Sequence, residues 1–144
     1  MTAADAKTLN ILLRGELAAT ETYQQAMAKA ANEEWAFLLR AIHGDHREAA
    51  NTLRQYVHSA GAQPDQGSGA WGVFAKAVEG TAKTFGKTAA LKALKEGEEH
   101  GVRSYEDALQ DEHMSAECTD LIRSRLLPQT KAHIPVLDNL MSAS

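Results

Sequence analysis

Hydrophobic residues recur along this chain with the three- and four-residue spacing of a helix face, and no segment alternates as a strand would. The spacing predicts one helix over residues 8–31 and a second from Asn32, a good N-cap, to a stop at Gly61. A third begins near Thr88, and a fourth follows Ser115, another capping residue. We therefore expect an all-α protein. The positions expected in its core are Leu9, Leu12, Leu13, Ala19, Tyr23, Met27, Trp35, Leu38, Leu39, Ile42, Ala49, Leu53, Val57, Leu91, Leu94, Val102, Tyr105, Leu109, Cys118, Ile122, Leu126, Val136, Leu137 and Leu140.

The connections between these helices predict how they are arranged. Almost no linker separates the first helix from the second, and a short turn separates the third from the fourth, so each pair should form an antiparallel hairpin. Between the hairpins, the turn-rich stretch GAQPDQGSG leads into a short amphipathic helix that Ser68 could cap and that carries Trp71, Phe74, Val78 and Phe85. A crossover of about 25 residues predicts a four-helix bundle of the crossover kind. We expect residues 1–144 to form a single domain.

Composition limits the partners and the compartment. With 44% hydrophobic and 24% charged residues and a net charge of −4, the chain resembles a globular protein that binds neither nucleic acid nor an anionic membrane. Cys118 is the only cysteine, which excludes an internal disulfide and favours a buried, inert thiol in the cytoplasm. No basic segment precedes an apolar run at the N-terminus, and no stretch approaches the ~18 apolar residues of a membrane span.

A sequence repeat places two glutamates inside the predicted bundle. GELAATETYQQAM (15–27) and GEEHGVRSYEDAL (97–109) share glycine, glutamate, tyrosine and alanine at the same four places, 82 residues apart from Glu16 to Glu98. In each copy the glutamate precedes the tyrosine by seven residues, about two helical turns, so both side chains lie on one face. Apolar residues surround both glutamates on that face, and we expect both carboxylates to project into the core.

Two histidines on the partner helices also lie among apolar residues at helical spacing. His46 and His133 are each preceded and followed by apolar residues at helical spacing, so both should face inward, and His43 lies one turn before His46. The remaining histidines should face away from the interior: His58, His100 and His113. An unpaired buried carboxylate costs several kcal/mol, so two of them require a cation. Glutamate and histidine from all four helices are the ligands of dimetal carboxylate bundles. The sequence thus predicts a metal site.

The segment LNILLRGELAATETYQQAMAKA resembles the first helix of bacterioferritin, with leucine-asparagine, then glutamate-leucine, then a tyrosine at similar places. Nearly the whole chain is similar to a ferritin-like bacterial family known only as a domain of unknown function. The features that carry this likeness are the two glycine-glutamate helices, the SGAWGVF element and the inward histidine of the fourth helix. The resemblance implies a ferritin-like four-helix bundle with a short crossover helix, in which Glu16 and Glu98 take the positions of iron ligands.

The chain departs from that pattern on the partner helices. In bacterioferritin and rubrerythrin each of these helices carries glutamate, two residues and histidine, and the glutamate bridges two irons. Here the tetrads are HGDH (43–46) and TKAH (130–133), so His43 and Thr130 occupy the bridging positions. Two carboxylates balance one divalent ion and not two. We therefore expect one zinc, iron or manganese ion held by Glu16, Glu98, His46 and His133, with His43 as a further candidate.

Several alternatives remain open at this level. The glutamates and histidines could instead form a metal-free hydrogen-bonded network. Tyr23 and Tyr105 could support the carboxylates or simply fill the core. Pro128 and Pro135 each remove a backbone bond and should bend or break the fourth helix near His133.

Three functions are compatible with the sequence. The first is a divalent metal-binding protein connected with metal or oxidative stress. The second is a metal-free scaffold that works through protein contacts, as a homodimer through the region of Trp71. The third, ranked lowest, is an oxidase in which His43 and a water replace the missing bridging ligands.

Overall fold

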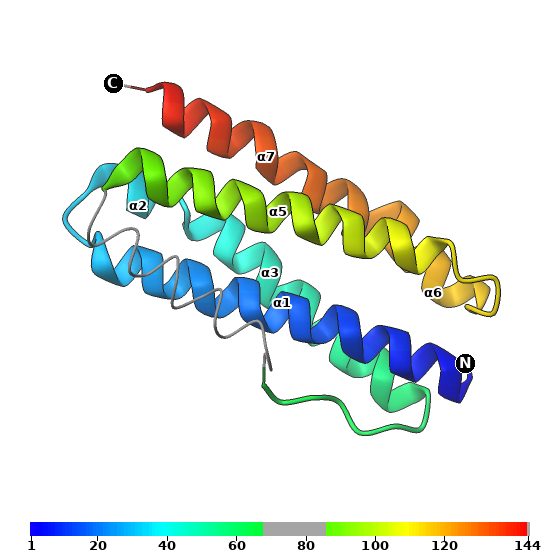
Figure 1. The fold of residues 1–144 in the computed structure, drawn as a ribbon. Helices are drawn as coiled ribbons and strands as arrows, with labels where there is room; N and C mark the ends of the chain where they lie inside the picture. Colours follow the sequence, from blue (N-terminus) through cyan, green and yellow to red (C-terminus); the bar gives the residue numbers. More distant parts are fainter. Residues whose placement is uncertain (68–85, 144) are drawn as a thin grey trace.

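The computed structural model describes residues 1–67 and 86–143, and every element within them is helical (Figure 1). The elements are α1 (Ala3–Lys29), α2 (Glu34–Phe37), α3 (Arg40–Ser59), α5 (Lys87–Leu109), α6 (Ala116–Leu121), the π-helical turn η1 (Ile122–Leu126) and α7 (Leu127–Ser142). The all-α prediction is confirmed for this part of the chain. The expected crossover helix, with Ser68, Trp71, Phe74, Val78 and Phe85, lies outside the described residues. Within the described ranges, no helix has the length and apolar character needed to cross a bilayer.

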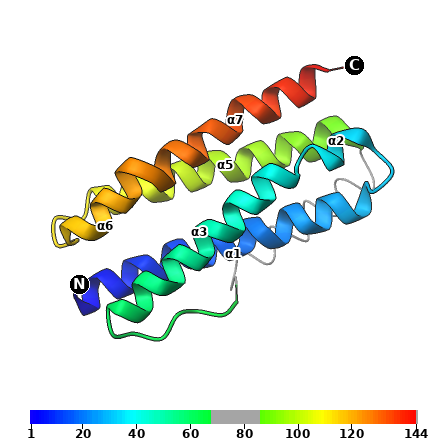
Figure 2. The same ribbon diagram turned by 180° about the vertical axis from the view of Figure 1, so that it is seen from behind.

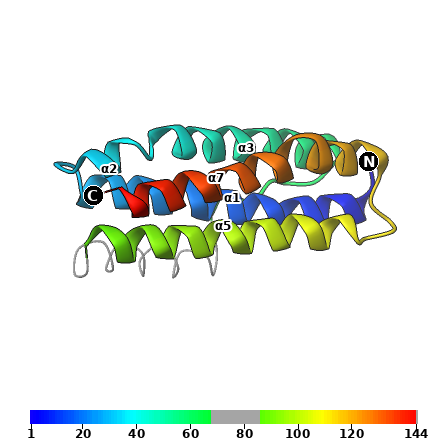
Figure 3. The same ribbon diagram turned by 90° about the horizontal axis from the view of Figure 1, so that it is seen from above.

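The long helices form a bundle of two hairpins. α1 packs most extensively against α3, α5 packs against α7, and α1 and α5 also meet (Figures 1 and 2). The N-terminus and α6 lie at one end of the bundle, and α2 and the C-terminus lie at the other (Figure 3). The predicted helical bundle is thus confirmed for the described residues.

The core of the described part of the chain consists of two apolar clusters, one toward each end of the bundle. The first includes Leu9, Leu13, Leu53, Tyr105 and Leu126, and the second includes Tyr23, Leu39, Ile42, Leu91 and Leu137. On every long helix the residues between the two clusters include one buried ionisable side chain: Glu16, His46, Glu98 and His133. The bundle therefore contains a polar layer between two apolar ones.

The second predicted helix is interrupted, which the sequence analysis did not anticipate. α2 ends at Phe37 and α3 begins at Arg40, and Asn32 does not cap either helix. The interruption lets Trp35 and Leu39 pack in the second cluster, while Leu38, expected in the core, is 47% exposed. Burial of these side chains outweighs the local preference for a continuous helix.

The fourth helix also differs from the prediction. α7 continues as an α-helix through His133 and Pro135, so the expected break there is wrong. The irregular part is instead η1, which ends two residues before Pro128 in the first turn of α7. Because a proline ring displaces the backbone of the preceding turn, the chain accommodates it before α7 begins. Val136, expected in the core, is exposed because the buried face passes through Leu137.

Candidate metal centre

Four buried side chains from four helices form the polar layer. Glu16 comes from α1, His46 from α3, Glu98 from α5 and His133 from α7, and each is at most 5% exposed. Their inward orientation agrees with the periodicity of the sequence. Groups of this kind are buried at such depth only when they satisfy one another or a bound ion.

Hydrogen bonds join these side chains into one chain. The Tyr105 hydroxyl donates to Oε1 of Glu16 (2.5 Å), and Oε2 of Glu16 lies 2.6 Å from Nδ1 of His46. Nε2 of His46 lies 2.5 Å from Oε1 of Glu98, which lies 2.8 Å from Nδ1 of His133. The chain ends at Asp45, whose Oδ2 lies 2.9 Å from Nε2 of His133 and whose side chain is 39% exposed. The network thus extends from the core to the surface of α3.

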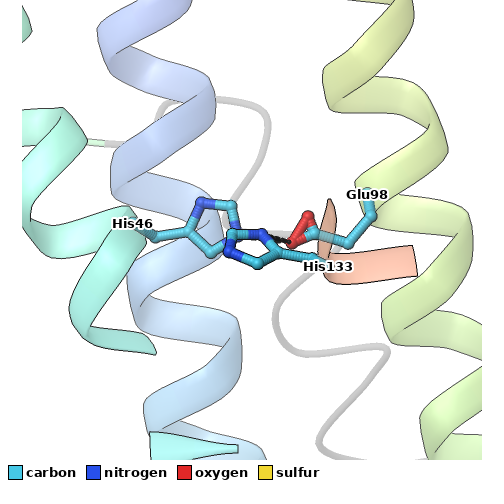
Figure 4. Close-up of side chains that lie close together, drawn as sticks. All are labelled: His46, Glu98 and His133. Atoms are coloured by element: carbon cyan, nitrogen blue, oxygen red, sulfur yellow. Dashed lines mark hydrogen bonds and ion pairs between the residues drawn. The ribbon is translucent and has the colours of Figure 1, made fainter. Parts of the chain in front are cut away.

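Oxygen Oε1 of Glu98 is the point at which the two histidines converge. Figure 4 shows both imidazole rings directed at this carboxylate. The centroids of the two rings are 4.9 Å apart. Tyr23 also donates to Oε1, at 3.3 Å, and its ring stacks on His46. One ligand atom each from His46, Glu98 and His133 lies within 4.8 Å of the others. Among the described residues, these three side chains form the group that could hold a metal ion.

The pKa values follow from this arrangement. Burial lowers the pKa of His46, but the carboxylates of Glu16 and Glu98 outweigh burial and raise it to about 10. Burial raises the pKa of Glu98, but hydrogen bonds from His133 and His46 lower it to about 2. The pKa of His133 is likewise raised, since Glu98 and Asp45 outweigh its burial. At neutral pH the metal-free layer therefore has a cationic His46 between two carboxylates.

Two predicted ligands lie outside the group of three. Glu16 contacts Nδ1 of His46, the ring nitrogen opposite Glu98. His43 is half-buried, and its Nε2 has no hydrogen-bond partner among the described residues. Its pKa is lowered by burial and by the nearby charges of Arg47 and His46. The structure therefore brings together three of the five candidates.

The other histidines follow the prediction only in part. His58 and His113 are exposed, as expected, whereas His100 is half-buried and lines a cavity between α1 and α5. Cys118 is fully buried, and burial raises the pKa of its thiol, in agreement with an inert role. None of these side chains belongs to the group of three.

Asp45 is a site residue that the sequence analysis missed. It immediately precedes His46, and adjacent helical residues point about 100° apart, so helical spacing does not place Asp45 on the inward face with His46. Its carboxylate nevertheless reaches His133 on α7. The acidic residue beside His46 in the HGDH tetrad was the sequence feature that could have indicated this contact.

The tyrosines of the repeat support the carboxylates of the opposite copy. Tyr23 on α1 donates to Glu98 on α5, and Tyr105 on α5 donates to Glu16 on α1. Both hydroxyls are buried, and their pKa values are raised well above 10 by burial and by the adjacent carboxylates. Both roles left open by the sequence are therefore present: the hydroxyls bond to the carboxylates, and the rings pack in the two apolar clusters.

The same groups offer the donor set of a metal site. Loss of a proton from Nε2 of His46 and from Nδ1 of His133 would leave two imidazole nitrogens and one carboxylate directed at a common point. Two nitrogens and one oxygen form a set that divalent zinc accepts, as do iron and manganese.

Comparison with known proteins assigns a family but no activity. A family model described as a domain of unknown function (DUF2383) matches residues 5–111, which include Glu16, His46 and Glu98 and end before His133. No curated protein and no solved structure matches the chain. Since the matched residues cover well over half of the sequence, the chain belongs to the DUF2383 family, whose function its description leaves open.

Proposed function

We propose that this protein binds one divalent metal ion in a ferritin-like bundle, through Nε2 of His46, the carboxylate of Glu98 and Nδ1 of His133. The observation that carries the proposal is the convergence of these three buried groups between two apolar clusters. Zinc, iron and manganese all suit the two-histidine, one-carboxylate set. A role in metal handling or oxidative stress is the context that such a site favours.

The outer contacts of both histidines support this assignment. Metal-binding histidines usually donate their second ring N–H to a carboxylate, which fixes the orientation of the ring. Glu16 occupies that position for His46, and Asp45 occupies it for His133. We therefore propose Glu16 as an orienting residue and not a direct ligand. Its negative charge, together with that of Glu98, balances a divalent ion.

The side chains around the layer favour one ion over two. The Thr130 hydroxyl donates to the carbonyl of Leu126 in the adjoining η1, and His43 lies outside the group of three. A second divalent ion would need two further carboxylates, and these two positions carry threonine and histidine. An oxidase that uses His43 as a substitute bridge accordingly remains the weakest proposal.

Metal analysis of the untagged protein tests the proposal. We expect about one zinc, iron or manganese ion per chain, and loss of binding in Glu98→Gln and His133→Ala. Glu16→Gln should weaken binding 10- to 100-fold, as expected for a residue that orients a ligand. His58→Ala is the matched control, because His58 is exposed and outside the layer. Metal content below a tenth of an ion per chain, with no zinc uptake on titration, would contradict the proposal.

A metal-free scaffold is the second candidate function, and one observation favours it. The hydrogen-bond chain from Tyr105 to Asp45 satisfies the buried carboxylates and imidazoles without an ion. If this is the working state, zinc should leave the unfolding temperature unchanged. The protein would then act through contacts with other chains, with a homodimer as the first state to examine by sedimentation.

A further inference from the structure

A cavity between α1 and α5 leads to the polar layer. Its volume is about 60 Å³, which is enough to hold water. Its walls include the small residues Gly15, Ala18, Ala19, Gly97 and Gly101. The cavity thus lies where the small side chains of the two helices leave a gap.

The inner part of the cavity is formed by the site itself. Glu16, His46, Glu98, Tyr23 and Tyr105 all line it, whereas His133 does not. The cavity therefore reaches the group of three from the side of α1 and α5, opposite the hydrogen bond to Asp45. Ile11 also lines the cavity and is 45% exposed, so within residues 1–67 and 86–143 the cavity extends to the surface of α1.

The chemistry of the cavity restricts what it can hold. Its walls are largely apolar, so a charged molecule would lose most of its hydration on entering. With the ion bound, the carboxylates of Glu16 and Glu98 already balance its charge, so an anion would add an unbalanced charge in a largely apolar surrounding. Its size limits the occupant to a few non-hydrogen atoms.

We propose that this cavity admits a small neutral molecule, of two to about four non-hydrogen atoms, to an open coordination position on the metal ion. The inference rests on the proposed function, because three protein ligands leave a fourth position free on an ion such as zinc or ferrous iron. The molecule binds through a lone pair, next to the carboxylate of Glu16 and the hydroxyls of the two tyrosines. Entry takes place between α1 and α5.

Nitric oxide, a neutral diatomic ligand, tests the proposal on the ferrous protein under anaerobic conditions. Its complex with ferrous iron is observed by electron paramagnetic resonance as a half-integer-spin signal, independently of any catalytic activity. Gly15→Leu and Ala19→Leu place a larger side chain at the cavity. A Cβ added at Gly15 meets no atom within 4 Å, so a larger side chain can begin there without displacing a neighbour. Gly44→Leu is the matched control, a helical glycine with an equally open Cβ that does not line the cavity.

We expect the wild type and Gly44→Leu to bind nitric oxide with the same affinity within twofold. At least one cavity variant that retains iron should bind nitric oxide tenfold or more weakly. Azide, an anion of similar size, should not bind at the same concentration. The proposal is overturned if the iron-loaded wild type gives no nitric oxide complex, or if the cavity variants that retain iron bind nitric oxide like the wild type. It is also overturned if neither Gly15→Leu nor Ala19→Leu retains iron, or if azide binds the wild type as well as nitric oxide does. Failure of the wild type to take up ferrous iron would instead overturn the proposed function, and this inference with it.

Discussion

His46 is the residue on which the chemistry of the layer depends. Its two ring nitrogens face two carboxylates, so in the metal-free protein the imidazolium is the cation that offsets their charge. A metal ion and a proton would compete for Nε2. The metal-free network and the metal site are thus two states of one set of side chains, separated by proton release.

This competition predicts a pH dependence of metal affinity. His46 stays protonated up to its raised pKa of about 10, so zinc must displace a proton throughout the neutral range. The apparent zinc affinity should therefore rise with pH, about tenfold per unit for each proton released. Competition titrations from pH 6 to pH 8 measure the slope. A flat profile would show that zinc binds elsewhere.

The stability of the metal-free protein should fall at high pH, whereas the zinc affinity rises. The raised pKa of His46 contributes to the free energy of unfolding. This contribution is complete below the usual histidine pKa of 6.5 and is lost as the pH rises through about 10. The lowered pKa of Glu98 makes a second contribution to the free energy of unfolding, which is complete above the usual glutamate pKa of 4.5 and is lost as the pH falls through about 2. We expect both contributions to be complete between pH 4.5 and 6.5. Urea unfolding with a chelator present measures this, and His46→Gln should flatten the alkaline side.

Removal of one tyrosine hydroxyl should destabilise the layer. Tyr105→Phe leaves Oε1 of Glu16 without its 2.5 Å hydrogen bond in a buried position. Loss of a hydrogen bond to a charged buried group costs about 1.5–3 kcal/mol. Tyr56→Phe is the control, because Tyr56 is half-buried and outside the layer. Equal free energies of unfolding for the two variants would contradict the assigned role of Tyr105.

At the scale of elements, periodicity predicted the long helices better than their ends. The helix expected over residues 8–31 begins at Ala3, where Thr2 and Asp5 form a reciprocal capping box that the sequence analysis overlooked. The interruption at residues 38–39 could not be predicted from local preference, because it results from packing of Trp35 at the end of the bundle. The prolines indicated an irregularity in the fourth helix, but not that it would be the π-helical turn η1 before Pro128.

Asp5 connects two elements, which gives a prediction at this scale. Its carboxylate accepts hydrogen bonds from the backbone N–H of Thr2 and of Ser115, the N-cap of α6. Thr2→Ala removes one capping bond and should cost about 1 kcal/mol. Asp5→Ala keeps the bond from its own backbone N–H to Thr2 but removes the carboxylate that accepts from Thr2 and from Ser115, and should lower the unfolding free energy by at least 1 kcal/mol more than Thr2→Ala. Similar losses in both variants would mean that the link to Ser115 contributes nothing.

At the scale of the whole molecule, the repeat predicted which side chains face inward but not how they pair. Glu16 and Glu98 correspond, as do Tyr23 and Tyr105, and each tyrosine contacts the glutamate of the opposite copy. The histidines break this symmetry, since His46 contacts both glutamates whereas His133 contacts Glu98 and Asp45. Which groups could share an ion depends on the relative heights of four helices, and periodicity within one helix carries no such information.

The position of the layer predicts how a metal ion would affect global stability. The three proposed ligands come from α3, α5 and α7, so an ion would connect both hairpins between the two apolar clusters. An ion that binds only the folded state stabilises it by about 2.7 kcal/mol when its free concentration is 100 times Kd. Zinc at that excess should therefore raise the unfolding temperature in one cooperative transition, and a chelator should reverse the shift. In His133→Ala the increment should disappear, because two of the three ligands cannot hold the ion at the same concentration, whereas His58→Ala should keep it. An equal shift in His133→Ala would mean that zinc acts at the surface of the protein and not in the layer.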